Sequence, residues 1–140
     1  MTRKGLQHNP LRVMLSPMNF DTPEQEFAWA VGIFEGEGSF ILGGAKRWPA
    51  LQMKLGMTDE DVIHKASAIL GLVVTGPYAQ RPLPDGRPSK PMFRATKGGP
   101  IARAMIRKML PYLGSRRRAR AEELLRATST GKRVRTYDKT

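Results

Sequence analysis

With 140 residues, no cysteine and a formal net charge of +12, the chain has the size of a single domain and the charge of a polyanion binder. The lack of cysteine excludes disulfides and cysteine-ligated zinc, and no run of about 18 apolar residues is present to span a membrane. The N-terminus also lacks the apolar segment of a signal peptide, so we expect a cytoplasmic protein.

The positive charge is concentrated in the second part of the chain. Residues 1–80 carry 7 basic and 8 acidic side chains, whereas residues 81–140 carry 17 basic and 4 acidic ones. This distribution favours a nucleic acid as the partner. A membrane surface fits less well, because no amphipathic basic helix with Trp or Phe anchors is present. No small-molecule substrate is expected.

The first predicted element is a helix that follows a loosely ordered arm at residues 1–20. Thr22 can cap its N-terminus, Pro23 suits the first helical position and Gln25 has the spacing of a capping box. We expect this helix to continue to about Gly36.

Two strands should follow, over residues 39–46 and 48–57, on either side of a Gly43-Gly44 turn. In the second strand, apolar residues at 51, 53, 55 and 57 alternate with Gln52, Lys54 and Gly56, so one face should pack and the other should be polar. A helix over residues 58–70 then begins with acidic residues and ends at Gly71.

The remaining elements are two strands and two helices. We expect strands at residues 73–80 and 91–96, joined by a turn-rich loop. A helix begins at Pro100, and its inward-facing residues are expected to be Ile101, Met105, Ile106 and Met109. A last helix should cover residues 115–127. The sequence thus predicts an arm (1–20), one domain (21–128) and a basic tail (129–140).

The most informative segment, AWAVGIFEGEGSF, ends the first helix. Small residues recur at every fourth position, at Ala28, Gly32 and Gly36, and form a flat stripe along which a second helix can approach closely. Glu35 and Glu37 lie in the last turn, where the helix dipole disfavours negative charge by about 0.3–1 kcal/mol. We therefore expect a cation to be bound there.

Residues 30–38, AVGIFEGEG, resemble the LAGLIDADG motif of homing endonucleases, with Glu in place of both Asp. A second resemblance is LPYL at 110–113 followed by RRRARAE at 116–122, which is similar to a Pro-Tyr-Leu, basic cluster and Ala-Glu helix of that family. The resemblance covers about residues 23–127. It implies an α+β fold of order αββαββα, with a four-stranded antiparallel saddle that lies on DNA and the motif helix at a homodimer interface.

The resemblance also implies a reaction, the hydrolysis of double-stranded DNA at a long pseudo-palindromic site in intron or intein mobility. Mg²⁺, or Mn²⁺ or Ca²⁺ in its place, would activate water and offset charge. Glu37 corresponds to the catalytic metal ligand and Gly36 to the peptide oxygen that often assists it. Glu35 is a less certain ligand, because its counterpart tends to hold the helix end or a neighbouring chain. One Glu37 per chain is too few for a metal site, so two copies are required.

Basic and polar residues complete the predicted site. Lys97 and Arg117 are candidates for a catalytic cation near the scissile phosphate. The candidate DNA contacts are Gln52, Lys54, Arg81, Arg94, Arg116 and Arg118.

Two other functions remain open: a non-catalytic DNA-binding regulator of the same fold, and a maturase that helps an intron RNA to fold. The intact acids at the motif end argue against the regulator. The positive charge suits either nucleic acid.

Overall fold

The computed structural model describes residues 19–43 and 49–128. The elements are α3 (Pro23–Glu37), β1 (Gly38–Gly43), β2 (Ala50–Met57), α4 (Glu60–Leu70), β3 (Val73–Tyr78), β4 (Met92–Gly98), α5 (Gly99–Met109), the short 3-10 helix η2 (Leu110–Tyr112) and α6 (Ser115–Ala127). This order confirms the predicted α+β fold. Most of the expected N-terminal arm, the turn after Gly43 and the expected C-terminal tail lie outside the described residues.

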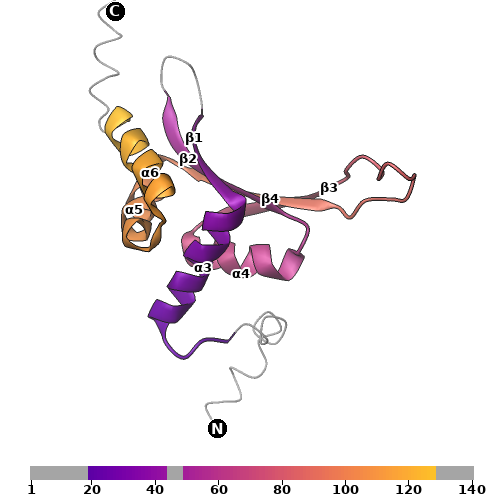
Figure 1. Ribbon diagram of the computed structural model, residues 1–140, viewed down its shortest axis with the longest axis horizontal. Helices are drawn as coiled ribbons and strands as arrows, with labels where there is room; N and C mark the ends of the chain where they lie inside the picture. The colour runs from indigo at the N-terminus through magenta and orange to yellow at the C-terminus, as the bar shows by residue number, and fades with distance from the viewer. Residues whose placement is uncertain (1–18, 44–48, 129–140) are drawn as a thin grey trace, which may run out of the picture.

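The four strands form one antiparallel sheet in the order β1-β2-β4-β3. The alternation predicted for β2 is confirmed, because Leu51, Met53 and Leu55 are buried while Lys54 is exposed. The buried face packs against the helices, and Figure 1 shows α3 and α4 beneath the middle of the sheet and α5 and α6 beside one end. The opposite face is not covered by any helix of the described chain.

The start of α3 follows the predicted capping pattern. Thr22 Oγ1 accepts a hydrogen bond from the Gln25 amide at 3.0 Å, and Gln25 Oε1 accepts one from the Asp21 amide at 3.0 Å. The helix continues one residue beyond Gly36, to Glu37. At the end of α4, Gly71 has a φ of 77°, the left-handed conformation that favours glycine.

The prediction for Ile101 was wrong, because its side chain is 59% exposed. The buried residues of α5 are Ala102, Ile106 and Met109, which recur at the spacing of one helix face. Ile101 lies about 100° around the helix from that stripe. None of the helices in the described part of the chain is long and apolar enough to cross a membrane.

Candidate functional site

Glu37 is the last residue of α3, and its carboxylate is exposed at the start of the open sheet face. The next residue, Gly38, is buried against Phe34, and a Cβ atom at this position would lie 2.6 Å from the Phe34 ring. A larger residue would therefore push the strand away from the helix. Within the described residues the Glu37 side chain has no hydrogen bond or ion pair, so its charge is free to bind an external cation.

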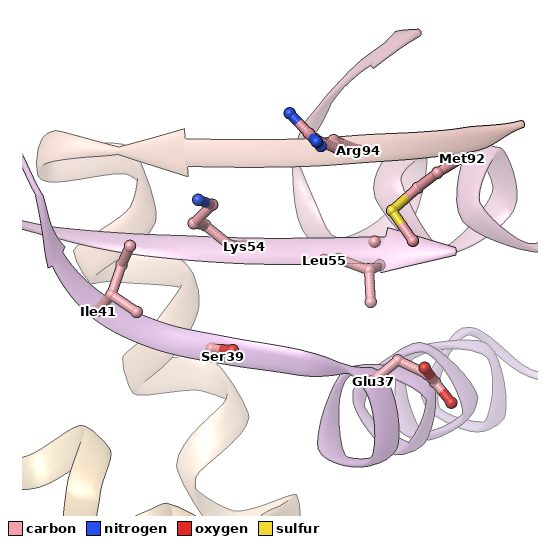
Figure 2. A pocket seen from close by; sticks show the side chains of 8 residues that line it. Glu37, Ser39, Ile41, Lys54, Leu55, Met92 and Arg94 are labelled. Carbon is pink, nitrogen blue, oxygen red and sulfur yellow. The ribbon is translucent and has the colours of Figure 1, made fainter. Parts of the chain in front are cut away.

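Glu37 borders an open hollow of about 500 Å³ on the uncovered face of the sheet (Figure 2). Residues of β1, β2 and β4 complete its lining, which consists of Ser39, Ile41, Lys54, Leu55, Gly56, Met92 and Arg94. Figure 2 shows that Lys54 and Arg94 project from the same side of the sheet. One carboxylate and two cations thus share a surface that could bind a metal ion and a polyanion side by side.

Glu35 points to a different part of the protein. Its Oε1 atom accepts a hydrogen bond from the Gly114 amide at 3.2 Å, and Gly114 caps the N-terminus of α6. The partial positive charge of that helix end favours a carboxylate. The structure therefore gives Glu35 a partner within its own chain, in line with the holding role considered for it, and not in the hollow beside Glu37.

Arg117 also contacts a residue of its own chain, close to Glu37. Its guanidinium donates a hydrogen bond from Nη1 to the carbonyl of Gly38, and the side chain is half-buried. Arg117 thus ties α6 to the residue that follows Glu37. Arg116 is exposed and borders a second hollow of about 300 Å³, which is lined by Ser39, Phe40, Arg116, Arg117 and Arg120.

The far end of α6 is held by Arg103 on α5. Its guanidinium donates hydrogen bonds to the carbonyls of Thr128 and Leu125, at 3.0 and 3.2 Å. Burial, with a smaller effect of the neighbouring Arg107, lowers the pKa of Arg103 from its ordinary value. Both ends of α6 are therefore fixed relative to the sheet.

Lys97 and Gln52 lie on opposite sides of the sheet. Lys97 on β4 is paired with the buried Met53, and paired residues point to the same side, so Lys97 faces the helices and is not brought to the hollow. Gln52 faces the open side, where its side chain occupies space left by Gly43 and Gly98 on the two neighbouring strands.

The two remaining predicted DNA contacts are exposed. Arg81 lies in the loop between β3 and β4, which projects beyond the sheet in Figure 1, and its carbonyl accepts a hydrogen bond from Ser89 Oγ. Arg118 on α6 forms an ion pair with Glu122 at 3.3 Å. Such exposed pairs are worth little, so Arg118 can exchange Glu122 for a phosphate.

The predicted stripe on α3 is uncovered. Ala28, Gly32 and Gly36 are all exposed, and a Cβ atom added at Gly32 or Gly36 would meet nothing within 4 Å. The described part of the chain thus gives no packing reason for these glycines.

Two residues of the site, Ser39 and Gly114, were missed in the sequence. Ser39, which lines both hollows, could have been found from strand alternation, since it lies opposite Lys54. Gly114 gave no usable signal, because its role depends on its contact with the distant Glu35.

No protein-family model matches the chain, and no curated protein matches its sequence. Solved structures do match. The homing endonuclease I-CvuI in complex with its target in the presence of Ca is 20% identical, with 76% of this chain and 68% of that chain covered and a TM-score of 0.54. The same enzyme in complex with the I-CreI target in the presence of Mg, with the DNA not cleaved, has the same identity and coverage and a TM-score of 0.53.

The group I intron-encoded homing endonuclease I-CeuI in complex with DNA is 12% identical, with 93% of this chain and 70% of that chain covered and a TM-score of 0.51. At such identities the likeness establishes the fold. The chain therefore has the fold of the LAGLIDADG homing endonucleases, which confirms the resemblance that its motif helix predicted.

Proposed function

We propose that this chain is a homing endonuclease that hydrolyses double-stranded DNA as a homodimer at a long pseudo-palindromic site. The observation that carries the proposal is the exposed carboxylate of Glu37, which has no partner among the described residues and lies at a helix end that disfavours it. It borders the same hollow as Lys54 and Arg94. A fold shared with DNA-bound homing endonucleases supports the same function. The place of action would be the compartment that holds the target DNA.

The oxygen donors at the C-terminal end of α3 fit a hard divalent cation. We propose Mg²⁺, for which Mn²⁺ or Ca²⁺ could substitute. Glu37 offers an exposed carboxylate, and the peptide oxygen of Gly36 is the proposed second donor. When bound, the ion would activate water and offset charge on the phosphate. No group of three metal-ligating side chains occurs within residues 19–43 and 49–128, so one chain supplies an incomplete site.

A second copy of the chain can complete the site through the exposed stripe of α3. Two such stripes packed against each other would bring the two helix ends, each with its Glu37, close to one axis. The two-fold symmetry of this arrangement calls for a palindromic or nearly palindromic target.

The surrounding residues receive separate roles in the proposal. Lys54 and Arg94 contact DNA across the open face, while Glu35 and Arg117 hold the motif end. Arg116 is exposed at the second hollow, which Ser39 also lines. Lys97 faces the helices, so Arg116 is the better candidate to approach the scissile phosphate.

A cleavage assay separates this function from its two rivals. Purified protein is incubated with Mg²⁺ and duplex DNA from around its own gene, with EDTA as the control. Metal-dependent cutting of both strands at one site supports the endonuclease. Specific binding without cutting indicates a DNA-binding regulator, and specific binding to an intron transcript without DNA cleavage indicates a maturase.

The exposed arginines of α6 should account for part of the salt dependence of DNA binding. Neutralising Arg116 and Arg118 to Gln should reduce the slope of log K against log salt by up to about 1.8, or about 0.9 for each phosphate that is no longer neutralised. Arg117 is left intact because it holds Gly38. Filter binding at several salt concentrations measures the slope, and Arg107→Gln with Lys108→Gln on α5 is the control. An unchanged slope in the α6 variant would show that neither arginine touches a phosphate.

Substitution of Glu35 should affect stability more than chemistry. Glu35→Gln should lower the free energy of unfolding by about 0.5–1 kcal/mol, because the amide oxygen can still accept from Gly114 but loses the charge favoured at a helix N-terminus. Glu35→Ala, which removes the acceptor, should cost more. Urea denaturation measures both. Parental stability together with abolished cleavage would instead make Glu35 a metal ligand.

A further inference from the structure

Arg94 is an exposed arginine on the open face of the sheet. It lies on β4, which is an inner strand, and β2 places only Gly56 opposite it. Its side chain has no ion pair with any carboxylate in the described part of the chain. Instead, Arg94 Cζ lies 4.5 Å from the centroid of the Tyr78 ring.

The aromatic partner of Arg94 owes its position to an irregularity in β3. Thr75 is paired with Arg94 and Tyr78 is paired with Met92, so β3 contains one residue more than β4 over this interval. In a regular strand Tyr78 would point toward the helices, whereas the extra residue turns its ring to the side of Arg94. Gly76, with a φ of 116°, accommodates the irregularity.

The ring is itself held in place. The Tyr78 hydroxyl donates a hydrogen bond to Thr75 Oγ1 at 2.8 Å, which fixes the ring over the strand next to Arg94. A guanidinium attracted to an aromatic ring keeps its planar set of N–H donors free at the edge. The guanidinium of Arg94 is therefore exposed, and its orientation is restricted by the Tyr78 ring.

Resting on the proposed function, we propose that Arg94 reads a guanine in each half-site and that Tyr78 is the positioning residue that aims it. A bidentate pair with the O6 and N7 atoms of guanine is the base contact that suits such a fork of donors. Two-fold symmetry then places one guanine in each half of the target, on opposite strands.

A phosphate is the competing partner for any exposed arginine. Arg94 is less suited to that role, because it stands on an inner strand among Gly56, Met92 and Thr75, while the other exposed arginines of the described residues lie on the loop between β3 and β4 and on α5 and α6. When a sheet lies along a groove of DNA, its inner strands approach the base edges, and the elements at its sides approach the sugar-phosphate backbone.

The test compares full-length variants in a binding selection from a duplex library with a randomised region, followed by affinity measurements on the selected site and its single-base changes. The variants are Arg94→Lys, which keeps the charge but loses the fork, Tyr78→Leu, which loses the ring, and Tyr78→Phe, which keeps it. Arg107→Ala on α5 is the matched arginine control. Circular dichroism melts confirm that each variant is folded.

We expect a symmetric pair of guanines in the parental site whose preference falls by about 10- to 100-fold in Arg94→Lys, with little change at other positions. Tyr78→Leu should reduce the preference several-fold at the same positions only. Tyr78→Phe, which keeps the ring but loses the hydrogen bond to Thr75, should reduce it less than Tyr78→Leu does, and Arg107→Ala should retain it. If Arg94→Lys lowers the affinity for all sequences equally, or keeps the preference for guanine, the inference is overturned but the endonuclease proposal stays intact. A parental protein that selects no sequence and cuts none overturns both.

Discussion

Glu37→Gln is expected to abolish DNA cleavage while leaving DNA binding unchanged or slightly tighter. The amide has nearly the same shape as the carboxylate but lacks the charge that would hold a divalent cation, so the rate should fall by several orders of magnitude. Binding should not suffer, because the substitution also removes a negative charge beside the phosphates. Since the Glu37 side chain has no partner in the described part of the chain and the helix end disfavours its charge, the free energy of unfolding should be unchanged or raised by up to about 1 kcal/mol. Cleavage rates and gel shifts on the same DNA measure the two effects.

The matched control for Glu37→Gln is Glu24→Gln, which removes an exposed carboxylate from the opposite end of the same helix. It should cut at the parental rate. Near-parental cutting by Glu37→Gln would remove the mechanism on which the endonuclease proposal rests. Equal losses in both variants would point to a general effect of charge on α3.

Gly32→Leu should convert the proposed dimer into monomers and abolish double-strand cutting. A Cβ at Gly32 meets nothing within 4 Å among residues 19–43 and 49–128, so the larger side chain has room there. Leucine also suits a helix interior better than glycine, by up to about 1 kcal/mol. In a close helix pair, however, it would force the backbones apart. Analytical ultracentrifugation together with a thermal melt distinguishes the loss of a dimer from the loss of the fold.

Ala68→Leu on the exposed side of α4 provides the control for added bulk, and it should remain dimeric. A folded Gly32→Leu protein that sediments as a stable dimer would show that the chains associate through another surface. The second chain would then not bring its own Glu37 next to the first, and the metal site would need another source of oxygen ligands.

Much of this fold could be predicted from local patterns, because most elements begin and end at residues with strong preferences. Thr22, Pro23 and Gln25 mark the start of α3, and Gly71 marks the end of α4. The alternation in β2 assigned Gln52 and Lys54 to the open face correctly. The same argument, applied to Phe93 and Ala95, would have placed Lys97 on the helix side.

Other parts of the site could not be predicted, because they depend on contacts between distant residues. The sequence around Arg117 indicates only a basic helix, and its bond to Gly38 exists because the sheet brings α6 to the motif end. Tyr78 reaches the open face through one extra residue in β3, and such a change of register leaves no periodic signal.

The two contacts that hold the motif end, Glu35 with Gly114 and Arg117 with Gly38, each join residues 79 positions apart. The segment around Glu37 leaves the ribosome early, yet its supports are synthesised only when the domain is nearly complete. A chain interrupted before Gly114 therefore has the motif but lacks both of these contacts. If the proposed chemistry is correct, unfinished translation products cannot cut the genome of their host.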